Sequence, residues 1–228
     1  MALADDIRIF LVNNPYIQRI SFTTTIGTVD TRRGRRPGPV GLKLQEVSRL
    51  TMTSIPTAGH RIYNIRPSDY TLVANAIRDG NIIVRTEGIR SPEAGAAYDF
   101  NYDSLELPSG FTLTSSRNKA FIVHECTHAI LDIRNIGRFS NYENEAVAYI
   151  AEAIILVASS QPALGSSNIR SISHRIAEDF MRSSSGTIPS RDFSQLVTAI
   201  SRHPHYESSV NIRSNRFNRS LIHEILRD

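Results

Sequence analysis

Residues 124–128 read His-Glu-Cys-Thr-His, and side chains of these types at this spacing can bind and use a metal ion. On a helix, residues four apart project from the same face, so His124 and His128 are expected to stand side by side. Two adjacent imidazoles can chelate Zn²⁺, and Glu125 between them is placed to act on a water molecule at the metal. The pattern is short, so the surrounding segments must support this interpretation.

A helix is expected around this pentapeptide. Apolar residues flank it on both sides with the spacing of a helix that is buried on more than one face. Residues 114–116, Thr-Ser-Ser, offer capping side chains at its start, and Gly137 follows its expected end. No proline interrupts the chain between Pro108 and Pro162. The sequence therefore predicts that both histidines lie in the middle of a helix.

A catalytic zinc usually takes three protein ligands and one water molecule, so one ligand remains to be found. The next segment, residues 140–158, is rich in Ala and Glu and begins with cap-forming residues, which predicts a second helix. The connection between the two segments is short, which favours an antiparallel helix pair. In such a pair, a glutamate near the start of the second helix can face His128.

Three glutamates of the second helix are candidates for the third ligand. Glu143 completes a capping box with Ser140, which explains it structurally, yet it shares a stripe with apolar residues and could face the interior. Glu145 shares its stripe with a small residue, which allows close approach of the helices, and with Tyr149, which could orient a ligand. Glu152 lies further along the helix, at a position that is too distant for the expected ligand.

Two stretches of the chain resemble the gluzincin, or thermolysin-like, zinc metallopeptidases. Residues 124–132, His-Glu-Cys-Thr-His-Ala-Ile-Leu-Asp, are similar to the zinc helix of that family, and residues 144–147, Asn-Glu-Ala-Val, resemble its third-ligand helix. The family often has an aspartate four residues after the ligand glutamate to hold a histidine, whereas this chain has Tyr149 there. The resemblance spans about residues 119–153 and implies a small, divergent member of the family.

This resemblance implies that His124, His128 and Glu145 bind Zn²⁺ and that Glu125 is the general base. The expected reaction is hydrolysis of a peptide bond, so a peptide or protein is the expected substrate. Glu125 would take a proton from the zinc-activated water and later give it to the leaving amine.

Other residues near these motifs have structural as well as functional interpretations. Cys126, the only cysteine, is expected to be a small buried residue that points away from both histidines. Asp132 either accepts a hydrogen bond from a ligand imidazole or only caps the helix end. The segment 203–206, His-Pro-His-Tyr, either lines a cleft or forms an exposed turn, of which the turn is favoured. A donor for the developing oxyanion is not assigned among its candidates, which are Tyr149, His174, His203, His205 and Tyr206.

Composition limits the classes of partner. Of the 228 residues, 40% are hydrophobic and 21% are charged, so the chain can bury a substantial core. The net charge is +4, and the cluster Arg32–Arg36 lies among glycine and proline, which predicts a loop. A solvated loop is favoured, and the alternatives are contact with nucleic acid, an anionic membrane or an acidic partner protein. No recognisable nucleic-acid-binding motif accompanies it, so binding of nucleic acid is not expected. The longest apolar run, 146–158, contains Glu152 and is too short to span a bilayer, so no membrane span is expected.

The N-terminus is acidic and lacks the apolar stretch of a signal peptide, and a single cysteine cannot form an internal disulfide. We therefore expect a cytoplasmic protein, or one that is exported without a cleaved signal peptide.

The predicted fold class is α+β, with a small mixed or antiparallel sheet in the N-terminal half, a zincin-like core of the His-bearing helix and an antiparallel Glu-bearing helix, and further C-terminal helices. A single domain over residues 1–228 is expected, with 1–66 as an alternative sub-module. Strands are predicted over 20–26, 59–65 and 82–86 and as a hairpin over 96–107, and additional helices over 68–78, 167–181, 191–202 and 218–227.

Two alternatives to a general zinc metallopeptidase use the same metal site. The first is a toxin or effector protease with one specific protein target, which would be accompanied by an inhibitory partner protein. The second is a non-catalytic zinc-binding regulatory protein. The presence of Glu125 favours a catalytic site over the non-catalytic alternative, because a purely structural zinc site needs no general base.

Overall fold

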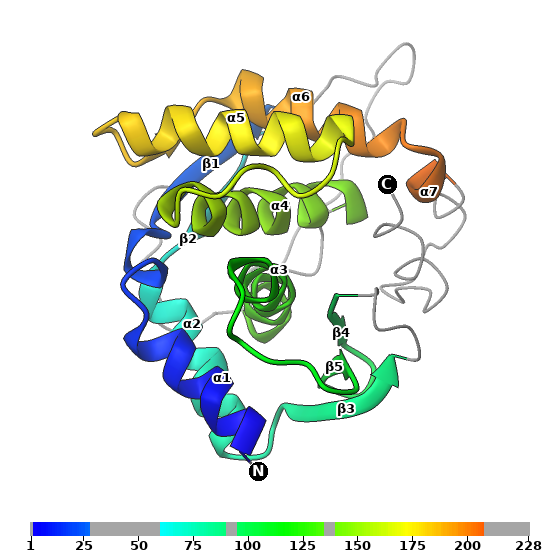
Figure 1. Cartoon of the computed structure of the whole chain (residues 1–228). Helices are drawn as coiled ribbons and strands as arrows, with labels where there is room; N and C mark the ends of the chain where they lie inside the picture. The colour runs from blue at the N-terminus through cyan, green and yellow to red at the C-terminus, as the bar shows by residue number, and fades with distance from the viewer. Residues whose placement is uncertain (1, 28–59, 90–94, 135–139, 208–228) are drawn as a thin grey trace, which may run out of the picture.

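The structure is a computed structural model that describes residues 2–27, 60–89, 95–134 and 140–207. Helices and short strands are mixed along the chain, as Figure 1 shows, so the predicted α+β class is confirmed. The predicted Arg32–Arg36 loop, Gly137 and the predicted helix over 218–227 lie outside the described residues.

The helices are α1 Ala2–Asn13, η1 Ile17–Arg19 (a 3₁₀ turn), α2 Pro67–Arg78, α3 Ser116–Ile133, α4 Asn141–Ala158, α5 Asn168–Arg182, α6 Ser190–Ser201 and α7 Pro204–Glu207. Side-chain caps start the two central helices. At α3, the Ser115 hydroxyl accepts a hydrogen bond from the backbone N–H of Asn118. At α4, Ser140 and Glu143 form the predicted capping box. These caps fix where each helix begins, and therefore which turn carries each functional side chain.

Helix α1 was not predicted, although its sequence carries a helical signal. Three of its apolar residues are spaced at i, i+3 and i+4 and are buried: Ile7, Phe10 and Leu11. Helix α2 begins at Pro67, one residue before the predicted start at Ser68, because the fixed φ of proline suits the first helical position.

The strands form two small sheets: β1 Phe22–Gly27, β2 His60–Ile65 and β6 Thr187–Ile188 in the order β2-β1-β6, and β3 Ile83–Ile89, β4 Ala97–Asp99 and β5 Ser104–Pro108 in the order β3-β5-β4. In the first sheet, β1 is antiparallel to β2 and parallel to β6. In the second sheet, β5 is parallel to β3 and antiparallel to β4. The predicted hairpin is thus present as β4 and β5, and β4 lies at an edge of its sheet.

Strand β6 joins the first sheet from a position far along the chain. It pairs with β1 through Thr187, whereas the strands β1 and β2 come from the N-terminal part. The prediction of a single domain over residues 1–228, and the alternative of a sub-module over 1–66, stay predictions, because 28–59 and 208–228 are outside the described residues.

Helix α3 lies at the centre of the molecule, with α4 on one side and the second sheet on the other (Figure 1). In this view α3 is seen along its axis and α4 from its side, so α4 crosses α3 rather than running back along it. The crossing brings one face of α4 against the face of α3 that carries the histidines. Helix α5 packs on the outer side of α4.

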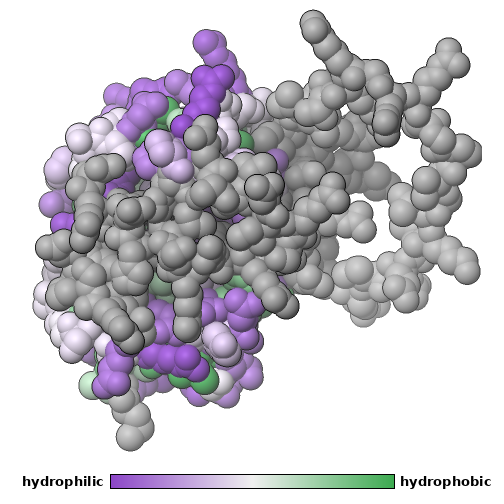
Figure 2. Space-filling view, turned by 90° about the vertical axis from the view of Figure 1, so that its right-hand side faces the viewer, coloured by the Kyte–Doolittle hydropathy of each residue, from purple (hydrophilic) through white to green (hydrophobic). Residues whose placement is uncertain are grey.

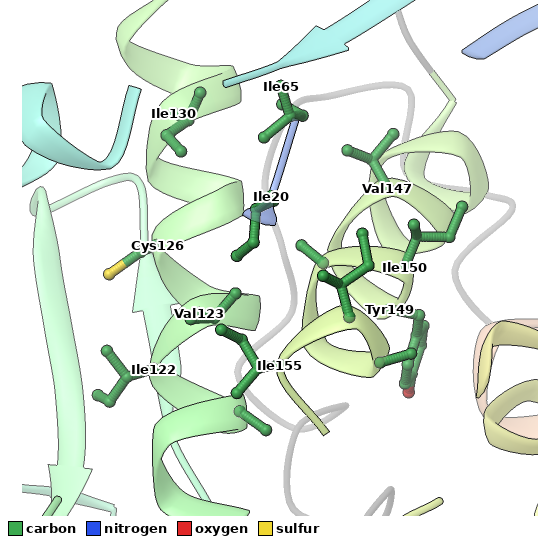
Figure 3. Packing of buried hydrophobic residues seen from close by; sticks show 14 of the residues in the cluster. Ile20, Ile65, Ile122, Val123, Cys126, Ile130, Val147, Tyr149, Ile150 and Ile155 are labelled. Atoms are coloured by element: carbon green, nitrogen blue, oxygen red, sulfur yellow. The ribbon is translucent and has the colours of Figure 1, made fainter. Parts of the chain in front are cut away.

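The hydrophobic core surrounds α3. Figure 3 shows Val123 of α3 facing the apolar side chains of α4, among them Ile155. Cys126 points to the side of α3 that is away from α4, and only 1% of it is exposed (Figure 3). The prediction that Cys126 is a small buried residue is therefore confirmed. Close packing of this kind leaves the polar residues of α3 few orientations, because interiors tolerate little rearrangement.

The described part of the face seen in Figure 2 is mainly hydrophilic, with small, separate hydrophobic areas. Among the described helices, none combines the length and the hydrophobicity needed to cross a bilayer.

Candidate metal centre

Two histidines of α3 are each held by an acceptor on α4. The Nδ1 atom of His124 lies 2.9 Å from Oε2 of Glu152, and the Nδ1 atom of His128 lies 3.0 Å from Oδ1 of Asn144. A carboxylate oxygen and an amide oxygen both accept hydrogen bonds, so each Nδ1 carries the proton. When a ring is neutral, its Nε2 atom then has the lone pair, which is the form in which histidine binds a metal.

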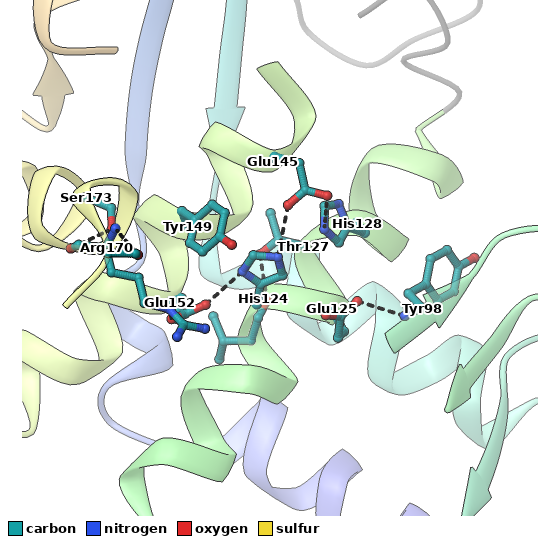
Figure 4. A network of polar contacts seen from close by, with 12 residues as sticks. Tyr98, His124, Glu125, Thr127, His128, Glu145, Tyr149, Glu152, Arg170 and Ser173 are labelled. Carbon is teal, nitrogen blue, oxygen red and sulfur yellow. Dashed lines mark hydrogen bonds and ion pairs between the residues drawn. The ribbon is translucent and has the colours of Figure 1, made fainter. Parts of the chain in front are cut away.

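Both Nε2 atoms face the carboxylate of Glu145 (Figure 4). Nε2 of His124 lies 3.5 Å from Oε2 of Glu145, and Nε2 of His128 lies 3.7 Å from Oε1. The potential ligand atoms of the three residues all lie within 4.8 Å of one another. Separations of this size allow the three residues to hold one metal ion.

The three side chains are buried, which strengthens their electrostatic interaction with a cation. The exposed fraction of the whole residue is 8% for His124, 9% for His128 and 5% for Glu145. At such depth, a carboxylate and two imidazoles interact strongly with a cation, because little water screens their charges. The structure thus brings together the three side chains that the sequence resemblance suggested as ligands.

The other two glutamates of α4 have different contacts. Glu143 completes the capping box and accepts a hydrogen bond of 2.8 Å from the Tyr63 hydroxyl, so it serves the fold. Glu152 was judged too far along the helix to act as the ligand, and it instead lies behind the ring of His124. Its position, seven residues after Glu145, returns to the same face of α4 because two helical turns take about seven residues.

Glu125 is held by the edge strand of the second sheet. The backbone N–H of Tyr98 in β4 donates a hydrogen bond of 2.7 Å to Oε2 of Glu125, as Figure 4 shows. In the β4–β5 ladder Tyr98 is paired with Leu105, and its N–H points to α3 instead of to β5. No other described strand pairs with this side of β4, and it faces Glu125.

Tyrosines surround the third ligand candidate. The Tyr206 hydroxyl donates a hydrogen bond of 3.2 Å to Oε2 of Glu145 and lies 3.2 Å from the Tyr149 hydroxyl. The ring of Tyr149 also packs edge-on against His124, with 4.8 Å between ring centroids. The expectation of an exposed turn over 203–206 was wrong, because Tyr206 lies on the short helix α7 and is only 4% exposed. The one sequence feature that could have indicated burial of this segment was the aromatic side chain of Tyr206.

Burial and neighbouring charges shift the pKa values of the site. Burial and the nearby Glu145 carboxylate raise the pKa of Glu125 to about 8, against the opposing charge of His124. Burial lowers the pKa of His128. Burial also disfavours the charged form of His124, yet its contacts with Glu145 and Glu152 outweigh this and raise its pKa to about 10.

The pKa of Glu145 is also shifted. Burial acts to raise it, but the charge of His128 and the contact with His124 outweigh burial and lower the pKa of Glu145. Glu145 is therefore an anion in the presence of these two imidazoles. An anionic oxygen beside two nitrogen donors is a set that binds a divalent cation well.

The remaining candidate residues lie elsewhere or have other partners. Asp132 accepts a hydrogen bond of 3.0 Å from the Tyr98 hydroxyl, so its partner is a tyrosine rather than an imidazole. His174 on α5 contacts the backbone oxygen of Gln161 and pairs with Glu178, away from the ligand candidates.

Comparison of the chain with models of protein families, with curated proteins and with solved structures gave no match.

Proposed function

We propose that this chain is a zinc-dependent metallopeptidase of the gluzincin type. One observation carries the proposal. His124 and His128 each have their Nδ1 atom held by an acceptor on α4, while both Nε2 atoms face the carboxylate of Glu145. Two neutral imidazoles and a carboxylate are a ligand set of catalytic zinc sites, in which a fourth position is open to water.

The donor set also indicates which chemistry the site supports. A Zn²⁺ ion held by these three residues would lower the pKa of a water molecule and polarise a carbonyl group. His124 and His128 would contribute nitrogen lone pairs, and Glu145 would offset one of the two positive charges. The centre would thus keep a net positive charge, which suits attack on a carbonyl carbon.

Glu125 is the proposed general base. Its carboxyl group lies close enough to His124 and Glu145 for their charges to shift its pKa, and the N–H of Tyr98 donates a hydrogen bond to it. It would take a proton from the attacking water and give it to the leaving amine. A general base held in this way favours catalysis over a purely structural zinc site.

Strand β4 supports a peptide as the substrate. One edge of β4, with which no other described strand pairs, faces Glu125, because the Tyr98 N–H points there. An extended peptide can add to such an edge through main-chain hydrogen bonds, which would place its carbonyl groups beside the metal. Tyr206, whose hydroxyl already contacts Glu145, is the proposed donor to the developing oxyanion.

The test is metal analysis and a generic protease assay on the wild type, Glu125→Gln and His128→Ala. We expect near-stoichiometric zinc in the first two proteins, none in the third, and cleavage by the wild type alone. Loss of the general base should lower turnover by about 10²–10⁴-fold while the metal stays bound. Equal turnover in Glu125→Gln would reject the mechanism.

A further inference from the structure

A buried arginine lies behind the residue that holds His124. Arg170 on α5 is only 6% exposed, and its Nε atom lies 3.7 Å from Oε1 of Glu152. The other oxygen of the same carboxylate, Oε2, lies 2.9 Å from Nδ1 of His124. The carboxylate of Glu152 therefore stands between a guanidinium and an imidazole, as Figure 4 shows.

This arrangement is costly to bury. Glu152 is 3% exposed, so both charges of the pair have lost most of their water. A buried ion pair recovers only part of that loss, and well-packed apolar residues of similar size are often as stable or more stable. Packing of α5 against α4 therefore does not explain why a guanidinium is present at this position.

The contacts of Arg170 point to Glu152. Its Nε–H has no hydrogen-bond acceptor among the described residues, so the carboxylate of Glu152 is the group that balances its charge. The two oxygens of this carboxylate have different partners: Oε1 faces Arg170 and Oε2 faces His124. A carboxylate that is held at one oxygen cannot easily turn its other oxygen away from the imidazole.

We propose that Arg170 is a positioning residue of the metal centre. By pairing with Oε1 of Glu152, it holds Oε2 against the Nδ1–H of His124. This fixes both the orientation of the ring and the tautomer in which Nε2 has its lone pair toward the metal. The inference rests on the metal-binding part of the proposed function and is independent of peptide hydrolysis.

The test measures zinc affinity, by competition with a chromophoric chelator, in the full-length wild type and in Arg170→Met, Glu152→Gln and the double variant. We expect each single substitution to weaken zinc binding by about 10–100-fold. Because Arg170 acts through the carboxylate, Arg170→Met should add little further loss in the Glu152→Gln background. Arg170→Lys, which keeps the charge, should bind zinc more tightly than Arg170→Gln. If Arg170→Met fails to fold, the comparison of these two variants tests the role of Arg170.

A matched control is Arg134→Met. Arg134 follows α3 and pairs with the buried carboxylate of Asp69, at a distance from the ligands along the helix. Its loss should lower the free energy of unfolding and leave zinc affinity unchanged. Such a result would separate a local effect at the metal from general destabilisation.

Three outcomes would overturn the role of Arg170. The first is wild-type zinc affinity in Arg170→Met. The second is equal zinc affinity of Arg170→Lys and Arg170→Gln, and the third is an equal loss from Arg170→Met with and without the carboxylate of Glu152. Zinc binding without peptide cleavage by the wild type would reject the peptidase function alone, whereas a wild type that binds no zinc would overturn both proposals.

Discussion

His124 and Glu152 are joined by a contact of 2.9 Å between Nδ1 and Oε2, and this contact comes from the turn of α4 that follows Tyr149. In the gluzincin pattern, the acid that holds a histidine often occurs four residues after the ligand glutamate. Here that place is taken by Tyr149, whose ring packs on His124, and the acid occurs seven residues after Glu145. Both spacings return to the same helix face, so the same contact can be made from the next turn.

Single substitutions on α4 should distinguish the proposed zinc ligand, Glu145, from the helix-capping residue, Glu143. Glu145→Gln should abolish tight zinc binding, because an amide oxygen is a poor replacement for an anionic ligand. Glu143→Gln should keep stoichiometric zinc but lower the free energy of unfolding by about 0.5–2 kcal/mol, since it weakens the capping box and the contact with Tyr63. Metal analysis and denaturant unfolding of both variants measure this. If Glu143→Gln lost zinc and Glu145→Gln kept it, Glu143 would be the ligand in place of Glu145.

Asn144 should tune the zinc affinity through His128. Its side-chain oxygen accepts from Nδ1 of that ring, so Asn144→Ala should weaken zinc binding by about 10–100-fold. Asn144→Asp keeps an acceptor and should remain close to the wild type. A chelator competition assay compares the three proteins, and equal affinities would exclude this contact as a support of the ligand.

Zinc binding should release protons at neutral pH. The pKa of His124 is raised to about 10, so without zinc the ring is protonated at pH 7, whereas His128 has a lowered pKa and is already neutral. Zinc binds only the neutral ring, so about one proton should leave per ion, and affinity should rise about tenfold per pH unit from pH 7 toward the pKa of His124. Calorimetry in buffers of different ionisation enthalpy counts these protons.

The proton count is best made in Glu125→Gln. The pKa of Glu125 is raised to about 8, and a nearby dication would release its proton as well. A zinc affinity that does not change with pH in this variant would show that the metal displaces no proton from His124.

Gly95 should control the position of β4. A Cβ atom at this residue would lie 2.4 Å from the ring of Phe121, which is closer than real Cβ atoms approach other atoms. Gly95→Ala should therefore displace the strand whose Tyr98 N–H holds Glu125, and lower both stability and kcat while zinc stays bound. Gly80→Ala is the control, because it strains a positive φ of 74° without such a contact. A kcat for Gly95→Ala equal to that of the control would reject this link.

Tyr206→Phe should lower kcat by about 10²–10³-fold with zinc still bound, because it removes the proposed donor to the oxyanion. Tyr142→Phe is the matched control, since among the described residues its hydroxyl contacts the backbone oxygen of Tyr206 and none of the ligand candidates. Steady-state kinetics on one peptide compares the two. Unchanged turnover in Tyr206→Phe would exclude the hydroxyl from the reaction.

The parts of the site that depend on local spacing could be predicted from the sequence. The i, i+4 arrangement of His124 and His128 and the capping box of Ser140 and Glu143 are properties of single helices. The helix pair itself could be predicted from apolar patterns and a short connection. Its crossing could not, because the crossing angle depends on how α3 packs against α2 and β4 and on α5 behind α4.

Partners that meet only through the tertiary fold could not be assigned for the same reason. Glu152 was considered only as a ligand and judged too far along its helix, and Tyr206 was one of five candidate oxyanion donors, in a segment where an exposed turn was favoured. Arg170 had no distinguishing pattern, since a single arginine on an amphipathic helix usually faces water. These residues reach the site because α4 crosses α3 and because α5 and α7 cover α4.

The most direct test of the central claim is a crystal structure of zinc-loaded protein with anomalous diffraction measured at the zinc absorption edge. We predict one strong anomalous peak, about 2.0–2.2 Å from Nε2 of His124, Nε2 of His128 and a carboxylate oxygen of Glu145. A peak at any other set of ligands, or none between these three residues, would contradict the claim.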